Sequence, residues 1–199
     1  MRILIIGATG AVGSAAAAEL GRRHEILRAG RSAGDVTVDL MNEASIREMF
    51  KKAGKLDAVV ATAGHTHFGP LSKMTGADFR KGLDDKLMGQ INLVLIAQHV
   101  LNDGGSITLT SGVLDRDPIR QGANAAAVNG ALGAFVKSAA LELERGIRIN
   151  AVSPGLLDVS AKKYDGFFPG HEPVSSARVG LAFAKSVEGG LTGQVIIVG

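Results

Sequence analysis

Short apolar runs alternate with longer helical stretches along the whole chain. The strands predicted from the apolar runs are residues 3–6, 24–28, 36–38, 56–61, 106–110, 147–152 and 195–198. The helices predicted between them are residues 11–20, a segment capped by Asn42 or Ser45 that ends near residue 53, and residues 83–101, 123–144 and 175–187. Strands that alternate with helices favour an α/β fold, in which helices cover both faces of a parallel sheet.

The chain shows no linker, low-complexity tract or internal repeat, so residues 1–199 are predicted to form one domain. Residues 156–173 contain several Gly and Pro breaks and are predicted to form a loop or lid. The composition, 46% hydrophobic and 21% charged, is that of a globular protein and excludes a disordered chain.

The chain contains no cysteine, which excludes disulfides, thiolate catalysis and cysteine-based zinc sites. The net charge of +3 comes without a dense Lys/Arg run, so we expect no nucleic-acid partner. No apolar run reaches the roughly 18 residues that cross a bilayer, and the apolar N-terminus is too short for a signal sequence. We therefore expect no membrane partner and a cytoplasmic location.

A glycine-rich turn, Gly-Ala-Thr-Gly-Ala-Val-Gly at residues 7–13, lies between the first strand and the first helix. Its first two glycines permit a tight turn and close approach by a pyrophosphate, and Gly13 permits close packing of the helix on the sheet. The helix N-terminus offers free N–H groups and the positive end of its dipole. The alternative is a glycine-rich turn without a ligand. The predicted phosphate-binding residues are Gly7, Thr9, Gly10, Ala11 and Val12.

The end of the second strand selects the substituent on the adenosine ribose. An acidic residue there binds a 2′-hydroxyl, whereas a basic one accommodates a 2′-phosphate. The chain has Arg31 and Ser32 at this place and no carboxylate before Asp35. The sequence therefore favours NADP(H) over NAD as the cofactor, although a solvated surface arginine is the alternative.

Four further segments are distinctive: Ala-Thr-Ala-Gly at residues 61–64, Leu-Thr-Ser at 109–111, Gly-Ile-Arg-Ile-Asn-Ala-Val-Ser-Pro-Gly at 146–155 and Thr-Gly-Gln-Val at 192–195. With the opening turn, they make the chain resemble the short-chain dehydrogenase/reductase family over essentially its whole length. The resemblance implies a Rossmann-like, doubly wound parallel sheet of about seven strands, with the site at their carboxyl ends. It also implies assembly as a homodimer or homotetramer.

The resemblance assigns further cofactor-binding residues in three places. They are Asp39 and Leu40 against the adenine, Thr62, Ala63 and Gly64 along the nucleotide, and Pro154 and Gly155 beside the nicotinamide.

The chemistry that the resemblance implies is hydride transfer between the nicotinamide and a carbonyl or alcohol carbon. In the family a Ser holds the carbonyl oxygen, a Tyr transfers the proton, and a Lys four residues later lowers the pKa of the Tyr. Ser111 matches the Ser. The Tyr position, however, falls on Ala125, the Lys position on Asn129, and a further Asn position on Lys86. The sequence therefore predicts an atypical member that lacks the Tyr-x-x-x-Lys pair.

Lys86 is the first candidate for the missing proton donor, because partial burial would lower its pKa. A surface lysine is the equally weighted alternative. His65 and His67 follow the fourth strand, and Tyr164 lies in the predicted lid, so each is a further candidate. The two histidines lack a third ligand, so no metal site is expected. Asn129 is expected to hydrogen-bond the ribose.

Two functions remain open from the sequence. The first is an NADP(H)-dependent oxidoreductase that acts on a small carbonyl or alcohol substrate through Ser111 and Lys86, with Phe167 and Phe168 of the lid covering the substrate. The second is a catalytically degenerate protein that binds NADP(H) and acts as a sensor or interaction module.

Overall fold

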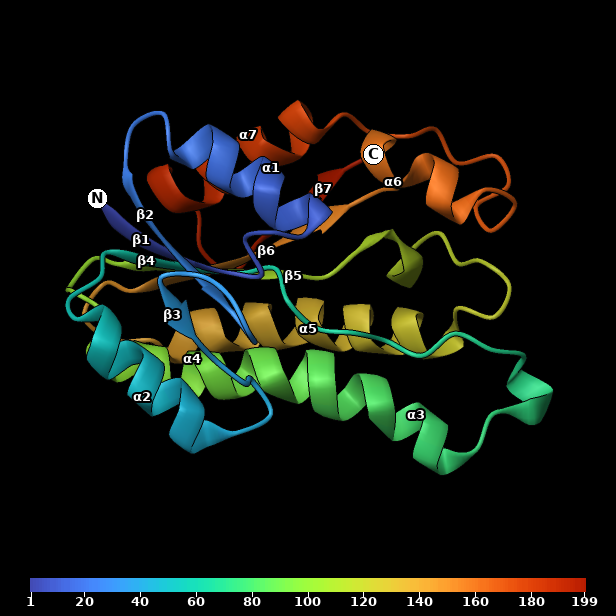
Figure 1. The fold of residues 1–199 in the computed structure, drawn as a ribbon, viewed down its shortest axis with the longest axis horizontal. Helices are drawn as coiled ribbons and strands as arrows, with labels where there is room; N and C mark the ends of the chain where they lie inside the picture. Colours follow the sequence, from blue (N-terminus) through green and yellow to red (C-terminus); the bar gives the residue numbers. More distant parts are fainter.

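The computed structural model describes residues 1–199 and has one seven-stranded sheet at its centre (Figure 1). All neighbouring strands are parallel, in the order β3-β2-β1-β4-β5-β6-β7. The strands are β1 Arg2–Ile6, β2 Glu25–Gly30, β3 Val36–Thr37, β4 Ala58–Ala61, β5 Ser106–Thr110, β6 Arg148–Pro154 and β7 Val195–Val198. This arrangement confirms the doubly wound, Rossmann-like sheet, with its switch of strand order between β1 and β4.

Helices cover both faces of the sheet. Helices α1 (Ala11–Leu20) and α7 (Ser176–Glu188) pack together on one face, whereas α2 (Glu43–Ala53), α4 (Gly89–Val100) and α5 (Ala123–Glu142) lie on the other (Figure 1). The sheet therefore separates two apolar clusters of buried side chains, one of 26 residues on the α4–α5 face and one of 17 on the α1–α7 face. The aliphatic strands supply both, since successive side chains point to opposite faces.

The helix expected at residues 83–101 differs from the observed one. The helical run begins earlier, with α3 (Gly76–Gly82), passes through a π-helical turn (Leu83–Met88) and continues as α4. The early start is explained by Thr75, which forms a reciprocal capping box with Asp78. Such π turns are rare and are frequently found at functional sites.

The segment 156–173, expected to be a loop, contains one helical turn. Helix α6 (Asp158–Ala161) runs into a 3₁₀ turn (Lys162–Tyr164). The Asp158 carboxylate accepts hydrogen bonds from the backbone N–H of Val159 and from the Ser176 hydroxyl. This turn is too short to produce a helical repeat in the sequence, which is why the pattern of residues did not reveal it.

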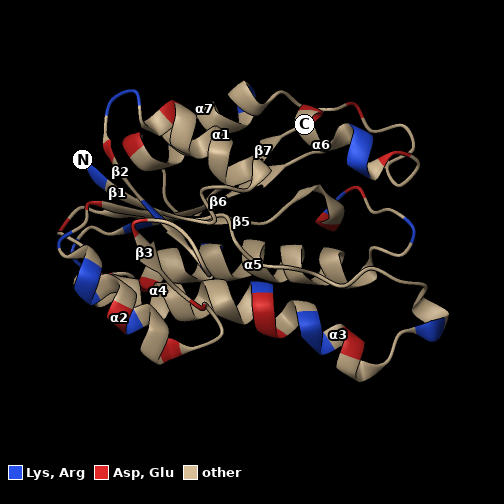
Figure 2. Ribbon diagram, viewed as in Figure 1, with Lys and Arg blue, Asp and Glu red and all other residues tan.

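Charged side chains of both signs are mixed over the outer helices and the loops (Figure 2). No helix of the structure is both long enough and apolar enough to cross a membrane.

At the start of α2, Asn42 is the capping residue: its side chain accepts hydrogen bonds from the N–H groups of Ala44 and Ser45. This observation decides between the two caps that the sequence left open.

The contact between α1 and the end of β1 depends on a glycine. A Cβ added at Gly13 would collide with the carbonyl oxygen of Gly7 and would lie 2.7 Å from Thr62 Oγ1. The helix can approach the glycine-rich turn this closely only because position 13 has no side chain.

We predict that Gly13→Ala lowers the free energy of unfolding by about 1–3 kcal/mol, because the added methyl group forces the turn and the helix apart. Chemical denaturation measures the change. Gly190→Ala is the matched control, since a Cβ at Gly190 has no atom within 4 Å. Equal stabilities of the two variants would contradict this account of the packing.

Candidate active site

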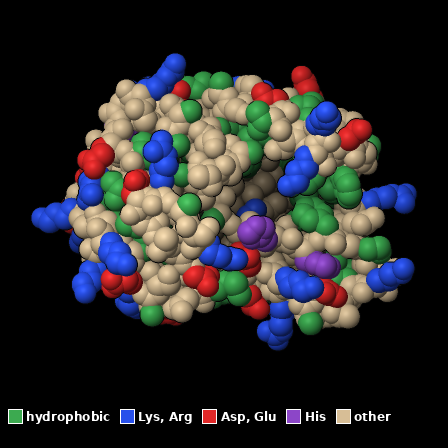
Figure 3. All heavy atoms as spheres, in the orientation of Figure 1, with side chains coloured by type: hydrophobic (Ala, Val, Ile, Leu, Met, Phe, Trp, Pro, Cys, Tyr) green, Lys and Arg blue, Asp and Glu red, His purple; other side chains and the backbone are tan.

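A crevice runs along the carboxyl edge of the sheet and is divided into two adjoining hollows. The first has a volume of about 330 Å³ and the second about 390 Å³. Gly10 and Thr62 line both, so the two hollows meet at the end of the glycine-rich turn. Figure 3 shows the hollowed face, with hydrophobic side chains gathered along one side of the hollow.

The glycine-rich turn forms the wall between the two hollows. Gly7 has a φ of +82°, and a Cβ there would lie 2.9 Å from Thr62 Oγ1. Helix α1 has no side-chain cap and no acidic residue in its first turn, whereas Asn42, Thr75 and Ser175 cap three other helices. The open N–H groups and the dipole of α1 therefore suit a phosphate group.

The second hollow lies between the ends of β1, β2 and β4. Its lining is mostly uncharged and includes one cationic and one acidic side chain, those of Arg31 and Asp85. The other lining residues include Gly7, Thr9, Gly30, Val38, Leu40, Ala63, Gly64 and His65. Arg31 is exposed at its rim. Ser32 and Asp39, which the sequence also assigned to the cofactor, are not part of the lining, and the Asp39 carboxylate accepts a hydrogen bond from the N–H of Met41 at 3.0 Å. The dimensions and the positive rim suit an adenosine phosphate.

Lys86 reaches the first hollow from the π turn. Its Nζ donates hydrogen bonds to the carbonyl oxygen of Ser111 at 2.7 Å and to Asn129 Oδ1 at 2.9 Å. Two glycines permit this approach. A Cβ at Gly64 would lie 2.8 Å from the Cα of Lys86, and one at Gly112 would lie 2.9 Å from Asn129 Nδ2.

The Lys86 amine is withdrawn from bulk water in this position. Burial lowers its pKa to about 8, and the carboxylate of Asp115 opposes the shift by favouring the charged form. Lys86 is the only charged residue in the lining of the first hollow. It can therefore exchange a proton near neutral pH.

Ser111 follows the last residue of β5 and is buried. Its Oγ is enclosed and has no hydrogen-bond partner, although its carbonyl holds Lys86. The preceding residue, Thr110, is fixed by the buried amide of Gln90, which donates to its carbonyl at 3.0 Å and accepts from its N–H at 2.9 Å. The Ser111 residue is thus held in place at the first hollow, and its hydroxyl lacks a hydrogen-bond partner, which is expected of a group that binds a ligand.

Helix α5 presents Ala125 and Asn129 to the first hollow, one turn apart on the same face. The opposite wall is apolar and comes from several loops, with Phe68, Leu114, Leu156, Leu157 and Phe168 among its members. From the segment expected to form a lid, Tyr164 and Phe168 line the hollow and lie 6.0 Å apart between ring centroids. Phe167, expected to act with Phe168, is half exposed and does not line it.

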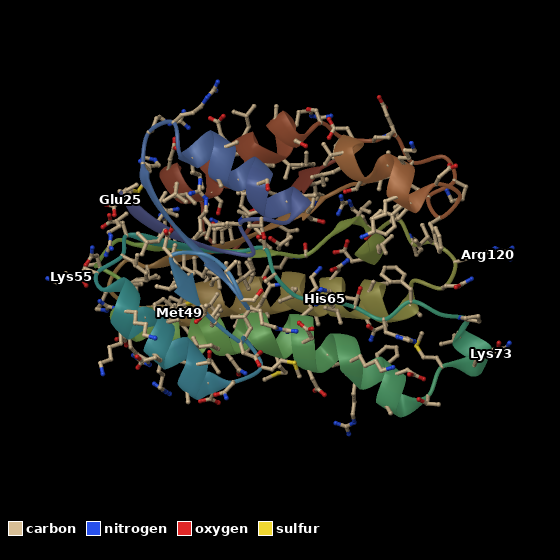
Figure 4. All side chains as sticks on the ribbon, viewed as in Figure 1. Glu25, Met49, Lys55, His65, Lys73 and Arg120 are labelled. Atoms are coloured by element: carbon tan, nitrogen blue, oxygen red, sulfur yellow. The ribbon has the colours of Figure 1, made fainter.

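Neither histidine candidate lines the first hollow. The side chain of His65 is 82% exposed, and its Nδ1 lies 3.2 Å from Asp85 Oδ2 at the second hollow (Figure 4). His67 lines neither hollow, and its backbone N–H donates to the buried Asn124. No group of three or more His, Asp or Glu side chains in the chain is arranged to hold a metal ion.

The structure brings most of the residues singled out in the sequence to the crevice. Ser111, Lys86 and Asn129 meet in the first hollow, together with Ala11, Val12, Pro154 and Gly155. The pattern of residues gave no signal for the members of the apolar wall other than Phe168, for the clamp of Gln90 on Thr110, or for Asp85 beside His65. These contacts join segments that are far apart in the chain, so no local spacing announces them.

The sheet order and the crevice at the switch in strand order define a dinucleotide-binding α/β protein. A family model described as enoyl-(acyl carrier protein) reductase matches residues 7–198. The chain therefore belongs to this family of short-chain dehydrogenases/reductases, which are oxidoreductases that act on small molecules.

Among curated relatives, the chain is similar to L-fucose dehydrogenase of Rattus norvegicus, with 34% identity over 125 residues that cover 61% of this chain and 46% of the relative. It is also similar to versicolorin reductase 1 of Dothistroma septosporum, with 27% identity over 203 residues that cover 88% and 77% of the two chains. The matched part thus spans about half the length of the first relative.

Among solved structures, the protein lin1944 from Listeria innocua has a TM-score of 0.98 and 50% identity, with full coverage of both chains. A small-chain dehydrogenase in complex with NADPH has a TM-score of 0.86 and 27% identity, and the similarity covers 100% of this chain and 96% of that one. The whole fold is therefore shared with these proteins.

Because the pKa of Lys86 is lowered in the folded protein, the free energy of unfolding depends on pH. Between about pH 8 and 10.5 the unfolded chain keeps the lysine proton that the folded protein has released, so the free energy of unfolding rises with pH. Relative to Lys86→Met, we predict a rise of up to about 3 kcal/mol across this window.

Urea denaturation at a series of pH values measures this difference. Lys51→Met removes an exposed lysine and serves as the control, whose curve is expected to parallel that of the native protein. If the Lys86→Met curve also runs parallel, the amine is not buried as described.

Proposed function

We propose that this protein is an NADP(H)-dependent oxidoreductase that interconverts a small carbonyl compound and its alcohol, with Lys86 as a nonstandard proton donor. The observation that carries the proposal is the position of the Lys86 amine, which hydrogen bonds to the Ser111 carbonyl oxygen and to Asn129 hold at the first hollow. We also propose that residues 1–199 form one cofactor-binding domain and that the protein assembles as a homodimer or homotetramer.

The cofactor assignment rests on the fit of the crevice. The open N-terminus of α1 and the positive φ of Gly7 suit the pyrophosphate, and Arg31 at the rim of the second hollow suits a 2′-phosphate. The similarity to a small-chain dehydrogenase in complex with NADPH supports the same choice. When bound, the nicotinamide would supply or accept the hydride.

The proton donor assignment rests on what lines the first hollow. We infer that Ala125 and Asn129 occupy the positions where relatives carry the Tyr and Lys of their catalytic pair. The only tyrosine of the chain, Tyr164, comes from the 3₁₀ turn after α6 rather than from α5. The space that a tyrosine side chain would fill at position 125 is left to the substrate and to the Lys86 amine.

In this proposal the chain performs three tasks. The Ser111 hydroxyl donates a hydrogen bond to the carbonyl oxygen of the substrate, and this oxygen is the partner that the hydroxyl lacks in the free protein. The Lys86 ammonium uses two of its N–H groups for Ser111 and Asn129, so the third is available to protonate the same oxygen. The apolar wall excludes water from the reacting atoms.

A degenerate protein that binds NADP(H) without turnover is the second candidate function. The absence of a tyrosine at position 125 favours it, because the family's proton-transfer residue is missing there. The two candidates differ in one measurement, since a sensor is stabilised by NADPH but does not consume it with any carbonyl substrate.

We predict that Lys86→Met lowers the rate of NADPH consumption with a carbonyl substrate by about 10²–10⁴-fold, the usual contribution of a positioned acid. NADPH binding, measured as thermal stabilisation, is expected to persist. The absorbance of the reduced nicotinamide follows the reaction across a panel of aldehydes and ketones. Full activity of the variant would exclude Lys86 as the donor, and stabilisation of the native protein without turnover would favour the sensor.

We predict that Arg31→Gln weakens NADPH binding by about 10–100-fold, the value of a lost charge-assisted contact. The affinity for NADH should be unchanged, because NADH has no 2′-phosphate. Arg47→Gln removes another exposed arginine, on α2, and is the matched control. Equal weakening for both nucleotides would refute the assignment of Arg31.

A further inference from the structure

The hydrogen bonds of Lys86 fit a neutral amine as well as they fit an ammonium ion. A neutral amine has two N–H donors and one lone pair, whereas an ammonium has three donors and no lone pair. Nζ has two acceptors, the carbonyl oxygen of Ser111 and Oδ1 of Asn129. If the amine donates both hydrogens to them, the lone pair is left without a partner.

The surroundings of Nζ leave room for a molecule to reach that lone pair. Lys86 lines a cavity of about 330 Å³, and the neighbouring lining residues Gly112 and Ala125 are small. The pKa near 8 leaves a substantial share of the amine neutral at pH 7.5–8, although Asp115 favours the charged form. An exposed lysine, with an ordinary pKa near 10.4, is almost entirely protonated there.

We propose that Lys86, in its neutral form, is a nucleophile that condenses reversibly with an uncharged, apolar aldehyde in the first hollow to give an imine. The inference goes beyond the oxidoreductase proposal and does not need the nucleotide, because it rests on the cavity, on the two acceptors and on the lowered pKa of the amine.

The step balances without an oxidant or a reductant. The lone pair of Nζ forms a bond to the carbonyl carbon, and the carbonyl π electrons move to oxygen, which is protonated. The carbinolamine then loses that oxygen with both amine hydrogens as one molecule of water, and a C=N double bond remains. Water reverses the reaction. We assign the hydrogen bond to the departing oxygen to the hydroxyl of Ser111, which lines the hollow and has no partner.

The lining of the cavity defines the class of aldehyde. Phe68, Tyr164 and Phe168 supply aromatic surface, and Leu114 and Leu156 supply aliphatic surface. Lys86 is the only charged lining residue and it reacts in its neutral form, so the lining then offers no charge to pair with an anionic substituent. Aromatic aldehydes without a charge fit this lining best.

The test is reductive trapping of the nucleotide-free protein. Benzaldehyde and sodium cyanoborohydride are added at pH 7.5, and peptide mass spectrometry locates the resulting benzyl groups. Lys86 is expected to be labelled at least about tenfold faster than the exposed lysines Lys51 and Lys137 of the same molecule, because more of its amine is neutral.

Asn129→Asp is the matched variant, since a carboxylate of the same shape beside Nζ holds the amine in its charged form. Labelling of Lys86 is expected to slow by about tenfold or more, whereas labelling of Lys51 stays the same. Labelling of Lys86 no faster than that of the exposed lysines, or an equal rate in the variant, would overturn the inference. Neither result touches the oxidoreductase proposal, which NADPH consumption tests separately.

Discussion

The burial of one cationic side chain at the carboxyl edge of the sheet constrains the rest of the site. An amine removed from water must find acceptors, and Lys86 finds the carbonyl oxygen of Ser111 and the amide oxygen of Asn129. Three features of the backbone serve this contact: the π turn that carries Lys86, and the glycines at positions 64 and 112, which leave space for the Lys86 stem and for Asn129. The strand end, the helix α5 and the π turn are thereby joined at one nitrogen atom.

The glycine-rich turn imposes a second and independent constraint on the other side of the crevice. Gly7 bends the chain out of β1, and Gly13 lets α1 pack against that bend. The uncapped N-terminus of α1 is then left open at the junction of the two hollows. A nucleotide bound here would accept hydrogen bonds from these N–H groups. Lys86 and Ser111 lie in the first hollow, on the other side of the turn. The nucleotide-binding part and the part around Lys86 therefore depend on different sets of residues. For this reason, residues around Lys86 can change while the nucleotide-binding part stays the same.

In the first hollow, the small side chain of Ala125 affects what chemistry the cavity allows. With Ala at position 125, no phenol competes for the space beside Nζ, and Asn at position 129 accepts a hydrogen bond where a lysine would repel the amine. In our two proposals, the same lysine is a proton donor in its charged form and a nucleophile in its neutral form. Which role operates depends on the proton that burial has made labile.

The sequence by itself determined the sheet and the glycine-rich turn that follows its first strand. Apolar runs of strand length, the glycines of residues 7–13 and the family motifs act through local conformation, so they can be recognised from neighbours in the chain. The sequence also singled out Lys86, Ser111 and Asn129, but left Lys86 as either a site residue or a surface lysine. Only the tertiary structure decided this point, because burial, the two acceptors and the apolar wall come from segments separated by 25 residues or more. The π turn escaped prediction for the same reason, since contacts across the fold, rather than the periodicity of its own residues, hold Lys86 in place.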